Sequence, residues 1–234
     1  MIRSRKNLAM GLGILTALFF ALVAPTARAA SAMPQFLITW KATGSYVPTN
    51  YQGKALPTYG SQITASLEII SNGQVANLQG QTIYWYLNDT LLGGGTGAQT
   101  ITFPPFGQAP NTMTLKVELP SYNGNFLIHT IAVPMVQPQA IIYAPYPNGQ
   151  FSTNPVAVTA VPYFFNTASP DDLSYAWSVN NQSGANTENP EEADITLPAG
   201  TAAGTTFEVS VNVQNGNDST VATISKTLTY QPSL

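Results

Sequence analysis

The chain has 234 residues, of which 44% are hydrophobic and only 8% are charged, and it contains no cysteine and one histidine. A typical soluble domain has about 25% charged residues. The solubility of this chain must therefore depend mainly on uncharged polar side chains. The composition excludes disulfides, iron–sulfur clusters, cysteine-based zinc sites and His-rich metal sites.

Positive charge is scarce beyond the first 28 residues. In the remainder, four lysines oppose eleven carboxylates, which gives a net charge of −7. Nucleic-acid binding needs clustered cations that displace the counterions of the phosphate backbone. We therefore expect no nucleic-acid partner.

The first thirty residues predict an export signal. Arg3, Arg5 and Lys6 precede an uncharged apolar run over residues 8–24, and small residues around Ala29 suit a signal peptidase. We expect a signal peptide over residues 1–29 and an extracytoplasmic protein, either secreted or held at the cell surface. The alternative is an uncleaved anchor, because about 17 apolar residues lie at the short end of a membrane span. If the segment is not cleaved, we expect the protein to contact the membrane only through it.

An exported chain without cysteine is more typical of bacteria than of a eukaryotic secretory route, where small domains depend on disulfides. We therefore expect a bacterial protein.

Beyond residue 33 the hydrophobic pattern has a period of two, which predicts β-strands with one buried face. Short apolar segments are separated by Gly, Pro and Asn turns, as in all-β proteins. The predicted inward-facing residues lie in five segments: Ile63, Ala65, Leu67 and Ile69; Met113, Leu115, Val117 and Leu119; Val156, Val158 and Ala160; Leu173, Tyr175, Trp177 and Val179; and Phe207, Val209, Val211 and Val213.

The two halves of this region repeat the same pattern. Four landmarks recur after 92 to 94 residues: Ile63 and Val156, Trp85 and Trp177, the segments 101–104 and 195–198, and Met113 and Phe207. A period of that size is typical of one sandwich domain. We therefore predict two β-sandwiches in tandem, over residues 33–134 and 138–234, joined at a segment with two prolines.

Each half places a tryptophan at the centre of a predicted strand. Residues 83–87, the turn at 88–90, the glycine-rich loop after it, the short strand 101–103 and the long strand ending at Leu119 resemble bacterial immunoglobulin-like domains. Residues 175–179 and 209–213 are similar to the polycystic-kidney-disease-repeat branch of that class. The resemblance implies an immunoglobulin-like sandwich fold and an extracellular spacer, stalk or adhesion module.

Few side chains offer reactive chemistry. His129, the one residue that normally titrates near neutral pH, lies in a strand pattern and is interpreted as a partly covered strand residue near a sheet edge. No Gly-x-Ser-x-Gly motif supplies a nucleophile. The segment 93–97, rich in glycine, lacks the lysine and the helix of a phosphate-binding loop and is interpreted as a flexible hairpin connection. We expect no catalytic residues, no cofactor and no enzyme activity.

Carboxylates gather in the second half. The second half has one basic residue, Lys226, and eight carboxylates: Asp171, Asp172, Glu188, Glu191, Glu192, Asp194, Glu208 and Asp218. The first half has three lysines and three carboxylates, Glu68, Asp89 and Glu118. Inter-strand loops with several carboxylates often bind calcium, which makes Asp171, Asp172, Glu191, Glu192 and Asp194 candidate ligands. The alternative is a solvated acidic rim that keeps the protein soluble.

Aromatic residues in a long loop form another candidate site. The segment 41–62 carries Tyr46, Tyr51 and Tyr59, and loops of this length are often functional. Exposed tyrosines stack on sugars and anchor interfaces, although aromatic residues also pin irregular segments onto a sandwich. The sequence thus predicts a surface or envelope module for adhesion, assembly or spacing, with surface proteins as partners. The alternative is a carbohydrate-binding protein that binds glycans through these tyrosines.

Overall fold

A computed structural model describes residues 33–184 and 189–232. The predicted signal peptide and Glu188 lie outside these residues. Among the residues described, no helix is long and apolar enough to cross a membrane.

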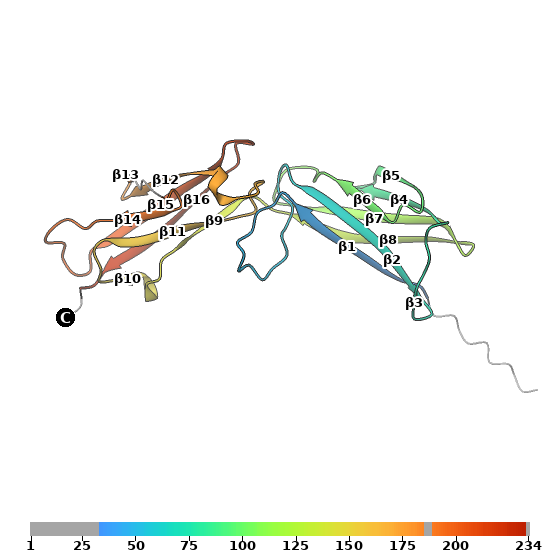
Figure 1. The fold of residues 1–234 in the computed structure, drawn as a ribbon, viewed down its shortest axis with the longest axis horizontal. Coiled ribbons are helices and arrows are strands. Elements are labelled where there is room, and N and C mark those ends of the chain that lie inside the picture. Colours follow the sequence, from blue (N-terminus) through green and yellow to red (C-terminus); the bar gives the residue numbers. More distant parts are fainter. Residues whose placement is uncertain (1–32, 185–188, 233–234) are drawn as a thin grey trace, which may run out of the picture. The chain divides into compact units, whose positions relative to one another are not determined.

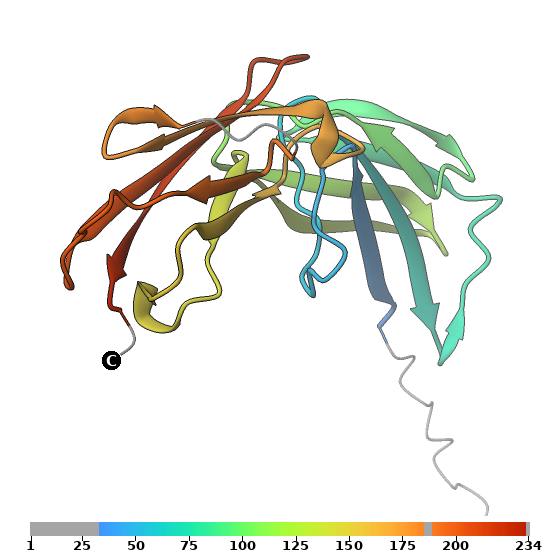
Figure 2. The ribbon, with the colours of Figure 1, turned by 60° about the vertical axis from the view of Figure 1, so that its left-hand side comes forward.

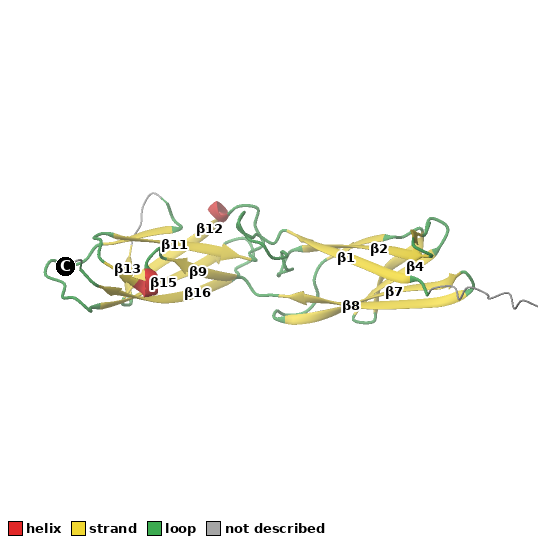
Figure 3. Cartoon of the chain, turned by 90° about the horizontal axis from the view of Figure 1, so that it is seen from below, coloured by secondary structure: helices red, strands yellow, loops and turns green. Residues whose placement is uncertain are grey.

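The first sandwich consists of two antiparallel sheets (Figure 1). One contains β1 (Gln35–Thr43), β2 (Gln62–Ser71), β3 (Gln74–Val75) and β6 (Thr100–Phe103), with β2 paired to the other three. The other has the order β5 (Thr90–Thr96), β4 (Thr82–Leu87), β7 (Asn111–Tyr122), β8 (Asn125–Met135). Figure 3 shows β1 and β2 as one layer and β7 and β8 as the other.

The second sandwich repeats this arrangement. One sheet has the order β14 (Glu192–Ile195), β11 (Val156–Tyr163), β9 (Gln139–Tyr143). The other has the order β10 (Gln150–Phe151), β16 (Val221–Tyr230), β15 (Thr206–Asn215), β12 (Leu173–Val179), β13 (Gln182–Gly184). Two short 3-10 helices, η2 (Pro147–Gly149) and η3 (Pro170–Asp172), precede β10 and β12. Strands β9, β11, β12, β13, β14, β15 and β16 occupy the positions of β1, β2, β4, β5, β6, β7 and β8.

The period-two pattern explains both cores. The predicted inward-facing residues of β2, β7, β11 and β15 are all buried, and in β12 Leu173 and Trp177 are buried while Tyr175 and Val179 are half-buried. One cluster of buried residues runs from Ile63 to Met135 and the other from Ala140 to Leu228, and they share no residue. The prediction of an all-β fold with two tandem immunoglobulin-like sandwiches is confirmed.

Each core is built around its tryptophan in the same way. Trp85 is fully buried and its indole Nε1 donates a hydrogen bond to the carbonyl oxygen of Ala98, at 2.8 Å. Trp177 is 5% exposed and its Nε1 donates to the carbonyl oxygen of Pro190, at 3.0 Å. Both acceptors lie thirteen residues after the tryptophan, just before β6 and β14. The internal repeat therefore extends to individual hydrogen bonds.

The hairpin after each tryptophan strand also recurs. Asn88 (φ 47°) and Asn180 (φ 50°) open two-residue turns in the left-handed region, which Asn tolerates better than most residues. The Asn88 side chain accepts a hydrogen bond from the backbone N–H of Thr114 at 2.8 Å. Asn180 accepts the corresponding bond from Glu208 at 2.9 Å. These turns fix the registers of β4 with β5 and of β12 with β13.

The interpretation of residues 93–97 as a flexible connection is wrong. Gly93, Gly94 and Gly95 lie within β5, opposite Trp85, Tyr84 and Ile83. A side chain at Gly94 would collide with the backbone of β4, because its Cβ would lie 2.3 Å from the carbonyl oxygen of Ile83. Glycine there permits close pairing of an edge strand, a role that composition alone does not distinguish from a loop.

Candidate functional site

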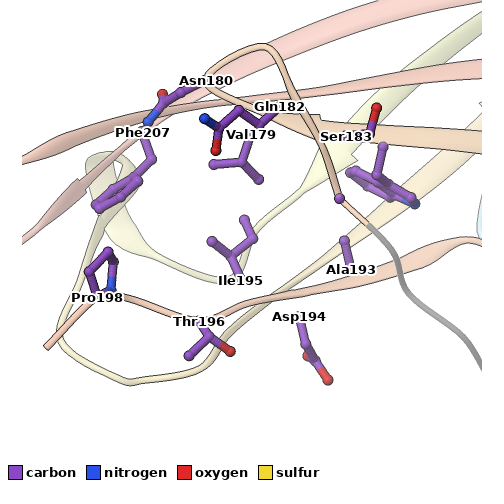
Figure 4. Close-up of a pocket in the computed structure, with 12 residues that line it drawn as sticks. Val179, Asn180, Gln182, Ser183, Ala193, Asp194, Ile195, Thr196, Pro198 and Phe207 are labelled. Atoms are coloured by element: carbon purple, nitrogen blue, oxygen red, sulfur yellow. The ribbon is translucent and has the colours of Figure 1, made fainter.

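A hollow of about 300 Å³ opens in the second sandwich where the edge strands β13 and β14 of its two sheets meet (Figure 4). We call this site the β13–β14 hollow. Its lining includes apolar residues from three strands and the segment after β14, namely Trp177, Val179, Ala193, Ile195, Pro198 and Phe207. Gly184 and five polar residues complete it: Asn180, Gln182, Ser183, Asp194 and Thr196.

The alternation of β14 determines which groups face the hollow. Ala193 and Ile195 are buried, whereas Asp194 and Thr196 are exposed. Figure 4 shows Val179 and Ile195 on opposite sides of the space, while Asp194 and Thr196 point away from it on the other face of their segment. The side chains of β14 that face the hollow are therefore apolar, and those on the other face of this segment are polar.

A difference between the two repeats explains why the space is open. In the first sandwich a β-bulge between β4 and β5 leaves Leu92 as an extra residue, and this leucine packs against the core. In the second sandwich β13 has no bulge: Gly184 lies opposite Trp177 as Gly93 lies opposite Trp85, and Ser183 precedes it. Among the residues that the structure describes, the second sandwich thus has no counterpart of Leu92 at this edge.

The β13–β14 hollow has few ionisable groups in its lining. Asp194 is the one ionisable side chain among its lining residues, so the lining does not provide the paired carboxylates of a glycosidase. The Asn180 side-chain oxygen is already occupied by the N–H of Glu208. The hollow is suited to a compact apolar group, with amide and hydroxyl groups at its rim.

Two of the three candidate tyrosines hold the long loop in place. This loop, residues 44–61, is visible as the long excursion between β1 and β2 in Figure 2. The backbone of Tyr46 pairs with the segment 164–165: its N–H donates to Phe165 at 2.8 Å and its carbonyl accepts from Phe164 at 2.6 Å. The ring of Tyr51 packs edge-on against Tyr163 and Phe164, with centroids 5.8 and 5.9 Å away.

Tyr59 differs from the other two because 61% of it is exposed. It borders a second hollow, of about 330 Å³, that is also lined by Thr58, Met135 and Gln137. The Thr58 hydroxyl is buried there and has no hydrogen-bond partner in the described structure. The three tyrosines therefore do not form one shared surface: Tyr46 and Tyr51 are half-buried, and Tyr59 alone of the three is exposed.

His129 is a partly covered residue of the edge strand β8, as the sequence pattern predicts. Its ring stacks on Phe36 of β1, with centroids 5.0 Å apart and an interplanar angle of 13°. Because β1 and β8 belong to different sheets, this stack covers an edge of the first core.

The candidate calcium ligands are not brought together. Within residues 33–184 and 189–232, no three Asp, Glu or His side chains lie close enough to hold a metal ion. Asp172 accepts a hydrogen bond from the Thr167 hydroxyl at 2.8 Å, and Asp194 lies at the β13–β14 hollow. Asp171 and Glu191 both lie within electrostatic reach of Tyr175: burial is the main cause that raises the pKa of this tyrosine, and Glu191 and Asp171 add to it.

The β13–β14 hollow was not predicted from the sequence. A signal was present, because the repeat aligns Leu91 and Leu92 near Ser183 and Gly184, so that a pair of large apolar residues is replaced by two small ones. The bulge that directs Leu92 to the core depends on the pairing of β4 and β5, and it becomes visible only in three dimensions.

The sequence matches no protein-family profile and no curated protein. Structural neighbours include the fibronectin(III)-like modules of Clostridium thermocellum CbhA, with 16% identity, 84% of this chain and 94% of that chain covered, and a TM-score of 0.32. Another is the Bacteroides ovatus mixed-linkage glucan utilization protein SGBP-B in complex with a heptasaccharide (13% identity, 85% and 47% covered, TM-score 0.27). A third is the central fibronectin-III array of RIM-binding protein (11% identity, 74% and 64% covered, TM-score 0.30).

Proposed function

We propose that this chain is an exported, non-enzymatic module of the cell surface or envelope that serves adhesion, assembly or spacing. The observation that carries the proposal is the repeat itself: strand order, tryptophan hydrogen bond and Asn turn all recur in a second sandwich with its own core. Tandem sandwiches of this kind present surfaces and edges to partners. The charged leader and the apolar run after it support export.

The partners we propose are other surface or envelope proteins. Within the immunoglobulin-like class, we assign the second sandwich to the polycystic-kidney-disease-repeat branch, supported by residues 175–179 and 209–213, which lie in β12 and β15. The low charge of the surface favours contacts through uncharged polar and apolar groups.

The location is tested on intact cells that express the full chain. Protease added outside the cells is expected to cleave the protein while a cytoplasmic marker in the same cells stays intact. Mass spectrometry of the untreated protein is expected to find Ala30 as its first residue, and a retained leader identifies the anchored form. Complete protection of the protein in intact cells, with cleavage only after lysis, would contradict the proposal.

A carbohydrate-binding function is the second candidate, and the exposure of Tyr59 beside a hollow favours it. If it is correct, insoluble polysaccharides retain the protein and Tyr59→Ala reduces retention at least about tenfold, because stacked aromatic residues are common hot spots. Tyr143→Ala is the matched control, since Tyr143, in β9, is 56% exposed and does not line that hollow. Equal retention of the two variants would eliminate Tyr59 as the sugar-binding residue.

A further inference from the structure

We propose that the outer face of β4 and β7, in the first sandwich, binds a neutral polysaccharide: two tyrosines stack on sugar rings, and the charged side chains beside them bind hydroxyl groups. We call this surface the Tyr84–Tyr86 face, and it consists of Tyr84, Tyr86, Asp89, Lys116 and Glu118. The inference rests on the second candidate function, carbohydrate binding, and it names a different site and the class of ligand.

The strand registers bring these side chains together. Trp85 and Val117 lie opposite each other and are fully buried, so the residues on either side of them point to the outer face of the sheet. Two rows of paired residues cross this outer face from β5 to β8. One row is Gly94, Tyr84, Glu118 and Ile128, and the next is Leu91, Tyr86, Lys116 and Thr130.

The second sandwich shows that the fold does not require large or charged side chains on this face. Its paired rows from β12 to β16 contain no aromatic and no charged residue among those described. They are Ala176, Asn212 and Thr223 in one row, and Ser183, Ser178, Ser210 and Ser225 in the next. In the turn, Asn181 stands where the first sandwich has Asp89. The tyrosines and charges of the first sandwich are therefore dispensable for folding, which favours a role in binding.

The charges of the Tyr84–Tyr86 face form one network. The Lys116 ammonium lies 3.1 Å from the Asp89 carboxylate and 3.2 Å from that of Glu118. It also lies 4.5 Å from the ring centroid of Tyr86, within the range of a cation–π contact. Half of the six charged side chains of residues 33–134 thus gather here. Groups that are already held in place lose little conformational entropy when they bind a ligand.

The two tyrosines lie along one strand. Because they are two residues apart in β4, their Cα atoms are about 7 Å apart, and a linear polymer that follows the strand contacts both rings. Gly94 lies opposite Tyr84, and a Cβ at Gly94 would lie 2.7 Å from the Cδ1 atom of Tyr84. The Tyr84 ring therefore leans over β5, along the sheet, which suits stacking on a sugar ring.

The composition of this face favours a polysaccharide over a protein partner. An extended peptide adds to the edge of a sheet, whereas β4 and β7 are central strands whose backbone groups pair with their neighbours. A folded protein would have to cover the ion pairs of Lys116, and burying charges at the centre of an interface is costly. A sugar offers an apolar ring face to the tyrosines and hydroxyl groups to the charges. The net charge of −7 beyond residue 28 disfavours acidic polysaccharides.

The test is affinity electrophoresis of the exported chain in native gels. The probes are hydroxyethylcellulose, xylan, galactomannan and soluble starch as neutral polysaccharides, and polygalacturonate as the acidic one. The wild-type protein is expected to be retarded by at least one of the neutral polysaccharides and to migrate past polygalacturonate without retardation.

The internal repeat supplies the variants. Tyr84→Ala and Tyr86→Ser introduce the residues that the second sandwich has at these positions, Ala176 and Ser178. Each is expected to weaken binding at least about tenfold, because aromatic residues at the centre of a contact are common hot spots. Both variants are expected to unfold close to the wild-type temperature, since the second sandwich folds with these residues. Tyr86→Phe retains the ring and is expected to bind more tightly than Tyr86→Ser.

Two further variants make the result specific to this face. Glu118→Gln keeps the size of the side chain and removes its charge, so it is expected to weaken binding about tenfold. It also tests the inference if a tyrosine variant fails to fold. Tyr143→Ala is the matched control, because Tyr143 is 56% exposed on the second sandwich, and this variant is expected to bind as the wild type does.

Three results would overturn the inference: a wild-type protein that no neutral polysaccharide retards, folded Tyr84→Ala and Tyr86→Ser variants that bind as the wild type does, or binding that only Tyr59→Ala abolishes. The last result would place the sugar at Tyr59 and leave the candidate carbohydrate function in place. None of them bears on whether the protein reaches the cell surface, which protease accessibility measures separately.

Discussion

Replacing Trp85 or Trp177 with alanine is expected to lower the free energy of unfolding of the affected sandwich by about 3–5 kcal/mol. Both indoles are buried, and each donates a hydrogen bond to a backbone carbonyl just before a strand of the opposite sheet. The substitution leaves a large cavity and removes the hydrogen bond of the indole, and each contributes to the loss. Denaturant unfolding followed by circular dichroism measures the effect.

Trp40 provides the control for the tryptophan substitutions. It is half-buried on β1, with the Lys54 ammonium 3.4 Å from its ring centroid, so Trp40→Ala is expected to destabilise the protein less than either of the other two. Unfolding curves of Trp85→Ala and Trp177→Ala that match the wild type would refute their assignment to the cores.

Phe165→Ala is expected to destabilise the second sandwich by a similar amount, about 3–5 kcal/mol. Although Phe165 lies outside any strand, it is fully buried and belongs to the second core. The residue before it, Phe164, has φ 60°, an unusual conformation for a bulky residue. The backbone bonds to Tyr46 and the burial of Phe165 together hold this segment in place.

Thermal and denaturant unfolding of Phe165→Leu separates ring packing from simple burial. Leucine retains most of the buried apolar surface, so its cost is expected to be clearly smaller than that of alanine. The exposed Phe126 serves as the reference, and its alanine variant is expected to lie within about 0.5 kcal/mol of the wild type. An equally small effect at Phe165 would show that the segment 163–166 contributes nothing to the second core.

The strands that carry the cores were predictable because each has one buried face and one solvent-exposed face. In β7, for example, the alternation of Met113, Leu115, Val117 and Leu119 with polar residues specifies both the strand and its buried side. The tryptophan strands were predictable from the repeat, because two independent segments carried the same signal. The turn at 88–90 was predicted as well, whereas the corresponding turn at Asn180 was not. His129 followed from the same periodicity.

The candidate site was less predictable, because it depends on contacts between strands that are distant in the sequence. Gly93 to Gly95 resemble a flexible loop in composition, yet they form a strand because β4 offers a paired edge. Likewise, the environments of Tyr46 and Tyr51 depend on residues 163–165, more than one hundred positions away. Periodicity describes a strand and its faces, and it carries no information on which distant segment packs against a loop.

The central claim is that the chain contains two sandwiches, each with a core of its own. Native-state hydrogen exchange on the full-length exported Trp85→Ala variant tests this claim most directly, because exchange reports the opening of each strand separately. We expect amides in β2, β4 and β7 to lose protection while those in β11, β12 and β15 keep the wild-type rates. Equal loss of protection in both sets of strands would show a single cooperative core and would contradict the account.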